Sequence, residues 1–153
     1  MNLLDALWGR PFLTPTEQEQ VEAGLATARR HAGEPIGLII DARASGDPEA
    51  RAASCFATWD IPQEARPRAI LLYACAATRR FAVVGGDEIR RVAPQAFWKA
   101  LHRDLTRHFE EGRYCDGLFK AIAQIAVQLH AHFHPTLPGD TPPTTDPPSP
   151  EHP

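Results

Sequence analysis

The chain has 153 residues, of which 43% are hydrophobic and 23% are charged, and its formal net charge is -3. This length predicts one domain with a single core, and the weakly negative charge argues against a nucleic-acid-binding face. Three scattered cysteines form no CxxC pair, so we expect a protein of the reducing cytoplasm. The opening residues lack a secretory signal, and no apolar run approaches the roughly 20 residues that cross a bilayer.

The first helix and the first strand carry the clearest local signals. Thr14 is a predicted N-cap, followed by Pro15 at the first helical position and Glu17 in capping-box spacing. Gly33 fits the C-terminal cap of the same helix. The apolar run IGLIID, residues 36–41, is typical of a buried strand.

The middle of the chain predicts one more helix and two more strands. Asp47 is the expected N-cap of the second helix, whose buried stripe we assign to Ala52, Phe56 and Trp59. A second apolar run starts at Ala69, and a third strand over residues 79–84 follows after a short turn. The tight connection makes these two strands antiparallel.

Two amphipathic helices and a proline-rich segment complete the chain. The helices have apolar stripes at helical spacing, at Phe97, Leu101, Leu105 and Phe109, and then at Leu118, Ile122, Ile125, Leu129 and Phe133. From Pro135 on, the sequence holds eight of the 15 prolines and cannot assemble a core. We therefore expect an N-terminal extension (1–11), an α/β domain (12–135) and a disordered tail (136–153).

The order of elements predicts a three-layer α/β/α sandwich with a small mixed sheet, a parallel pair plus an antiparallel hairpin strand. Residues before the two parallel strands and residues after the returning strand meet at one sheet edge. This edge collects Glu34, Arg66, Arg68, Asp87 and Glu88. Asp87 has two interpretations there, a cation ligand or the N-cap of a short helix. Asp41 stands at the opposite edge, as a turn residue or a ligand.

Residues from about 12 to 135 resemble a TPM domain, a family that includes a thylakoid acid phosphatase and photosystem II repair factors. The matching segments are FLTPTEQEQVEAGLATARR, the Gly-Glu before the first strand, ILLYACAATRRFAVVGG and FWKALHRDLTRHFEEGRYCDGLFKAI. The closing HFHP is similar to the small cytosolic members without a membrane anchor. The resemblance implies an α/β/α sandwich, divalent-metal binding at one sheet edge in several members, and acid phosphatase activity in some.

The sequence departs from the family pattern at this edge. Where the family has Arg-Asn-Gly before the second strand, this chain has Arg66-Pro67-Arg68. Where the family has Gly-Asp after the third strand, this chain has Gly85-Gly86, and the acid comes one position late, at Asp87. Ca²⁺ takes about six to eight oxygen ligands, so Glu34, Asp87 and Glu88 are a weak predicted set for Ca²⁺ or Mg²⁺. Arg66 or Arg68 is expected to form ion pairs with these carboxylates instead.

These departures favour a cytosolic binding or regulatory module with a degenerate metal edge, no catalytic residues and an unknown protein partner. The alternatives are a metal-dependent phosphatase acting on small phosphomonoesters through Glu34 and Asp87, and a structural interaction domain. His130 and His134, spaced for one helix face, are a further hypothesis for zinc, but the sequence shows no third ligand. Restoring the family pattern with Pro67→Asn, Arg68→Gly and Gly86→Asp is expected to create metal affinity.

Truncation at Pro138 is expected to leave the stability of the domain almost unchanged, because few of the removed residues can bury apolar surface. The measurement is the melting temperature of the shortened chain beside that of the full chain. A sharp drop would show that the removed segment packs on the domain.

Overall fold

A computed structural model describes residues 12–43 and 46–135 of the chain. The expected N-terminal extension and proline-rich tail lie outside these residues. The elements follow in the order α2 (Pro15–Ala32), β1 (Ile36–Asp41), α3 (Pro48–Ala57), a 3₁₀ turn η1 (Arg66–Arg68), β2 (Ile70–Cys75), β3 (Arg80–Gly85), α4 (Asp87–Val92), α5 (Gln95–Glu110) and α6 (Tyr114–Phe133).

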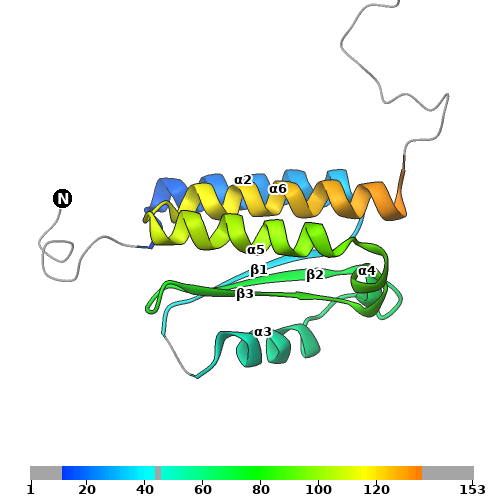
Figure 1. Ribbon diagram of the computed structural model, residues 1–153, viewed down its shortest axis with the longest axis horizontal. Helices are drawn as coiled ribbons and strands as arrows, with labels where there is room; N and C mark the ends of the chain where they lie inside the picture. Colours follow the sequence, from blue (N-terminus) through cyan, green and yellow to red (C-terminus); the bar gives the residue numbers. More distant parts are fainter. Residues whose placement is uncertain (1–11, 44–45, 136–153) are drawn as a thin grey trace, which may run out of the picture.

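The elements form three layers (Figure 1). Helices α2, α5 and α6 cover one face of the sheet, and α3 covers the other face. The strand order is β1-β2-β3, with β1 and β2 parallel and β2 and β3 antiparallel. The expected α/β/α sandwich with a small mixed sheet is confirmed.

The helix boundaries follow from the caps that the sequence carries. Thr14 and Glu17 form the complete capping box of α2, and Gly33 ends this helix with a left-handed φ of 71°. The Asp47 side chain accepts a hydrogen bond from the Ala50 amide at the start of α3. One expectation is wrong: α3 ends at Ala57, so Trp59 lies beyond the helix. The Trp59 ring lies against Gly37 instead, where a Cβ atom would be 2.9 Å from Trp59 Cζ2.

The core lies on both faces of β2, the central strand, all of whose residues are buried. The larger apolar cluster fills the space between the sheet and α2, α5 and α6, and a smaller one around Tyr73 and Ala52 lies between the sheet and α3. Strands β1 and β3 are the two edges. None of the helices in the described part of the chain combines the length and apolar character that a membrane crossing needs.

Candidate functional site

Three chain segments meet at one end of the sheet, as the strand directions predicted. Gly33 ends α2 and turns the chain to Glu34 just before β1. The turn η1 precedes β2, and the loop after β3 returns to it through a 2.9 Å hydrogen bond from the Gly86 amide to the Ala69 carbonyl. The C-terminal end of α6 lies at the same end (Figure 1).

The centre of this site is the buried carboxylate of Glu34, whose side chain is only 5% exposed. Its Oε1 lies 2.9 Å from Arg68 Nε, and its Oε2 lies 2.6 Å from His134 Nε2. A carboxylate leaves water at a high free-energy cost unless it is paired. Both oxygens of Glu34 are therefore engaged by nitrogen groups.

The guanidinium of Arg68 supplies positive charge beside Glu34. Its contact with Glu34 raises the pKa of the Arg68 guanidinium, and the negative charges of Glu88 and Glu64 act in the same direction. The contact is an ion pair rather than an aligned hydrogen bond, because no described residue accepts from Nε in hydrogen-bond geometry. The guanidinium also lies over the Phe133 ring, 5.9 Å from its centroid. One arginine thus stands among three acidic side chains.

Arg66 has a different role from its neighbour in η1. Its guanidinium donates hydrogen bonds to the Phe56 carbonyl, at 2.6 Å, and to the Trp59 carbonyl. It also lies over the Phe56 ring. Arg66 therefore fastens the connector to the end of α3, and of the two candidate arginines only Arg68 reaches Glu34.

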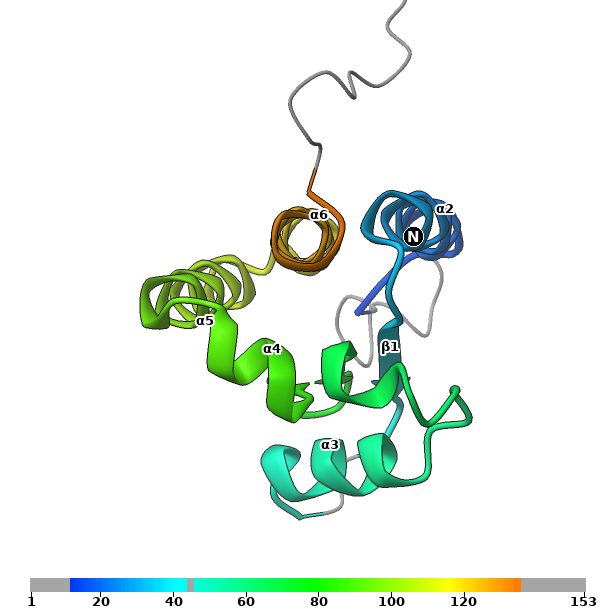
Figure 2. The same cartoon turned by 90° about the vertical axis from the view of Figure 1, so that its right-hand side faces the viewer.

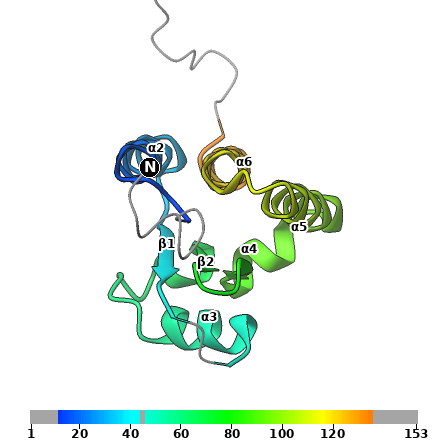
Figure 3. The same cartoon turned by 90° about the vertical axis from the view of Figure 1, so that its left-hand side faces the viewer.

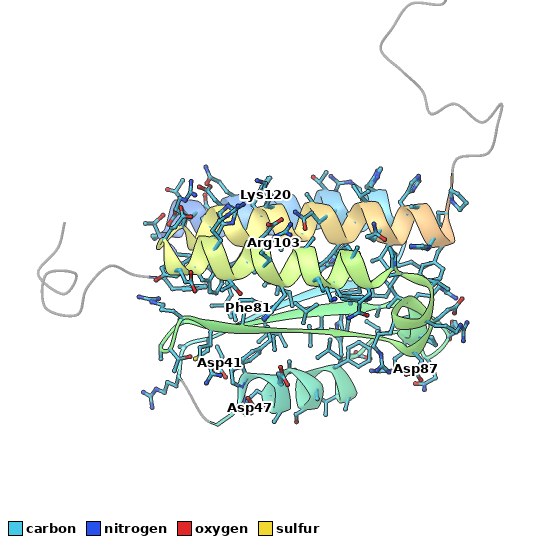
Figure 4. The ribbon with its side chains drawn as sticks, in the orientation of Figure 1. Asp41, Asp47, Phe81, Asp87, Arg103 and Lys120 are labelled. Carbon is cyan, nitrogen blue, oxygen red and sulfur yellow. The ribbon has the colours of Figure 1, made fainter. Side chains whose placement is uncertain are left out.

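Asp87 and the buried carboxylate of Glu34 have different partners. Gly86 is the N-cap of α4, and Asp87 is the first helical residue, so the expected capping role of Asp87 is wrong. The helix starts one residue early because the chain leaves β3 at Gly85 and turns at Gly86. The Asp87 side chain is 88% exposed and forms an ion pair with Arg90. Asp87 and Asp41 lie at opposite ends of the sheet (Figure 4).

Gly86 has no room for a side chain, although its φ of -68° is ordinary. A Cβ atom there would lie 2.3 Å from the Arg66 carbonyl oxygen and 2.5 Å from that of Pro67. Both obstacles are backbone atoms of η1. An aspartate therefore does not fit at Gly86 unless η1 moves, so the restored pattern depends on its two substitutions in η1, and its metal affinity stays a prediction.

His134, named from the sequence only as a zinc hypothesis with His130, contacts Glu34 in the structure, a pairing that the sequence did not predict. Its ring packs on Gly33, where a Cβ atom would lie 3.0 Å from His134 Cδ2. His130 instead places Nδ1 3.2 Å from the His31 carbonyl and stacks on the His31 ring. The two histidines thus have different partners. Within residues 12–43 and 46–135, no three His, Cys, Asp or Glu side chains are grouped to hold a metal ion.

At the opposite end of the sheet, Asp41 is held by three donors. Its Oδ2 accepts hydrogen bonds from the Tyr73 hydroxyl, at 2.8 Å, and from Arg51, at 3.1 Å, and Oδ1 accepts from the Arg43 amide. The Tyr73 hydrogen bond is the largest cause that lowers the pKa of Asp41, followed by the Arg43 amide and Arg51. Asp41 therefore ties β1 to β2 and α3 and makes the turn expected from the sequence.

Comparison with known proteins agrees with this architecture. The sequence pattern of the TPM domain matches residues 10–128. No curated protein matches the chain in sequence. The BA42 protein of the psychrophilic bacterium Bizionia argentinensis has a similar structure, with a TM-score of 0.69 and 20% identity over 78% of this chain and 83% of that one.

Two further solved domains share the fold. The N-terminal domain of a protein from P. gingivalis has a TM-score of 0.63 at 17% identity, covering 78% of each chain. The N-terminal domain of cg2496 from Corynebacterium glutamicum has a TM-score of 0.56 at 11% identity, covering 75% of this chain and 72% of that one. The family match spans most of the described residues. The chain belongs to the TPM domain family.

Replacing Gly86 by alanine is expected to destabilise the domain by about 1–3 kcal/mol, because overpacking against backbone atoms forces the chain to shift. Gly85→Ala is the matched control. The nearest atom to a Cβ there is Trp98 Cη2 at 3.0 Å, the end of a side chain that can move. Denaturant unfolding of both variants measures the difference, and equal losses would contradict the packing of η1 against Gly86.

Tyr73→Phe is expected to raise the pKa of Asp41 toward its ordinary value, because it removes the largest cause of the lowered pKa. A carboxylate with a lowered folded-state pKa stabilises the fold above its unfolded pKa, and this contribution is lost as the pH falls through the folded value. The unfolding free energy of the natural chain should therefore be higher than that of Tyr73→Phe, and this difference should be larger at neutral pH than in acid. Denaturant unfolding at both pH values and an NMR titration of Asp41 measure this, and a pH-independent difference would contradict it.

Proposed function

We propose that this TPM domain is a non-catalytic binding or regulatory module of the cytoplasm whose cation edge is occupied by the protein's own basic groups. The observation that supports this proposal is the buried Glu34 carboxylate, with Arg68 at one oxygen and His134 at the other. A divalent cation would have to displace both contacts. The Arg68 guanidinium supplies positive charge among the carboxylates of Glu34, Glu88 and Glu64.

The small number of oxygen ligands at this end of the sheet supports the same proposal. A hard cation needs about six or more oxygen ligands, and a fixed guanidinium beside them repels it. Of the predicted set, Glu34 and Glu88 act on Arg68, whereas Asp87 is exposed and paired with Arg90. Binding of Ca²⁺ or Mg²⁺ by Glu34, Asp87 and Glu88 would therefore require the loss of at least one of these ion pairs.

The rival function, a metal-dependent phosphatase, needs Glu34 and Asp87 to share one cation that polarises a phosphoryl oxygen. The ion pair between Asp87 and Arg90 disfavours this arrangement. An interaction domain with a purely structural role has the same charge arrangement as our proposal, and it differs only in lacking a regulated partner.

Arg68→Ala is expected to lower the unfolding free energy by about 1–3 kcal/mol, since it leaves one oxygen of a buried carboxylate without its ion pair. Arg68 is 31% exposed, so water offsets part of this loss. The same variant is expected to be stabilised by Ca²⁺ or Mg²⁺, which the natural chain is not. Thermal melts and calorimetric titration with each cation measure both effects.

Two further variants separate charge from size. Arg68→Lys keeps the positive charge and should show no cation response, and Glu34→Gln added to Arg68→Ala should abolish the response. Cation binding by the natural chain that is lost in Glu34→Gln would overturn the proposal. Turnover of p-nitrophenyl phosphate that both a chelator and Asp87→Ala abolish would favour the phosphatase.

A further inference from the structure

The free edge of β3 presents backbone groups that no described residue pairs. The register places Gly86 opposite Ala69, and the Gly86 amide bonds to the Ala69 carbonyl. In an antiparallel ladder such pairs alternate with pairs whose N–H and C=O groups point away. Phe81, Val83 and Gly85 are therefore the residues of β3 whose backbone groups face outward, and no described residue forms a hydrogen bond with them.

A cleft of about 800 Å³ runs along this edge. One wall comes from α3, with Ala53 and Phe56, and the other from α5, with Trp98 and Leu101. Trp98 touches the Gly85 end of the strand, whereas the outward groups of Phe81 and Val83 face the middle of the cleft. Natural sheets protect an exposed edge with proline, lysine, a bulge or a covering loop. The interior of β3 has neither proline nor a charged residue.

The cleft is lined by four charged side chains and by the polar Gln63 and His102, whose ring packs on Phe81, and its other side chains are apolar. Glu49, in the first turn of α3, stands near the Phe81 end. Arg66 and Arg90 stand at the Gly85 end with Asp87, which leaves one net positive charge there. An occupant with a basic residue beside Phe81 and an acidic residue beside Gly85 would match both ends.

Two other occupants fit this edge less well. Helix α5 is the outermost helix of its layer on the side opposite β1 (Figures 2 and 3). Antiparallel edge-to-edge pairing with a second copy would place both α5 helices on the same face, side by side at the junction. Residues 136–153 of this chain contain seven prolines, and proline has no N–H to donate to a ladder.

We propose that the β3 edge is a docking site for an extended peptide segment of a partner protein, which pairs with Phe81 and Val83 and adds a fourth strand to the sheet. The main chain of such a segment supplies hydrogen bonds, and its alternate side chains enter the pockets on the two sides. Side chains opposite Phe81 and Val83 face Leu101 and Trp98, and those between face Ala53 and Phe56. The partner is therefore an apolar, extended segment with a basic residue at one end and an acidic residue at the other.

This inference rests on the proposed binding function and describes the kind of partner that would bind. The partner would bind along β3 and not at the Glu34 end of the strands. Cation titrations test the Glu34 edge alone. Peptide binding tests the β3 edge alone, so the failure of one proposal is distinguishable from the failure of the other.

The experiment selects binders to the full chain from a library of random linear heptapeptides displayed on phage. The strongest binder is synthesised in three forms: unmodified, N-methylated at odd positions, and N-methylated at even positions. Pairing with one edge requires every second N–H, so one methylated form should lose binding by about tenfold or more and the other should not. Backbone amide shifts of the protein should change most at residues 81–85.

Ala53→Arg is the variant that tests the cleft, because Ala53 is exposed on α3 and lines it. It should weaken the unmodified peptide by about tenfold or more by filling the groove. Ala50→Arg is the same change on the same helix at an exposed position outside the cleft, and it should leave binding unchanged. The proposal is overturned if no peptide is enriched, if both methylated forms bind equally, if the two arginine variants behave alike, or if the chain self-associates through β3.

Discussion

A carboxylate buried beside the sheet constrains the whole end of this domain. Both oxygens of the Glu34 carboxylate are paired, because Arg68 and His134 approach it from different parts of the chain. Arg68 belongs to the turn before β2, and His134 follows the last residue of α6. One side chain therefore couples the start of the sheet, the connector and the final helix. Loss of either partner would leave a buried charge that the apolar core on both faces of β2 cannot compensate.

The departures from the family pattern form one consistent arrangement rather than separate losses. The η1 turn brings the Arg66 and Pro67 carbonyls against Gly86, which removes the space for an aspartate side chain. The same turn brings Arg68 within 2.9 Å of the Glu34 carboxylate. The position of η1 thus accounts both for the lack of space at Gly86 and for the ion pair between Arg68 and Glu34.

Local signals and strand directions were sufficient to predict most of the fold. The capping box at Thr14, the glycine cap at Gly33 and the apolar runs determine where elements begin, and two parallel strands with one returning strand determine which loops meet. Nothing local indicates that α6 ends beside Gly33, since this depends on how two long helices pack. The contact between His134 and Glu34 could not be predicted for that reason. Asp87 was misassigned as a cap because a shift of one residue changes an N-cap into a first-turn residue without altering the composition.

The Glu34 end of the strands and the β3 edge differ in which polar groups they leave without partners. At the Glu34 end of the strands, the Glu34 carboxylate is paired with Arg68 and His134, and a bound cation would have to break these contacts. Along β3 the unsatisfied groups are neutral peptide N–H and C=O groups beside apolar walls. A bound strand could pair with them without breaking a hydrogen bond or an ion pair of the described residues. Since recognition is favoured where the protein loses least on binding, the β3 edge is a better candidate for a binding surface than the charged end of the strands.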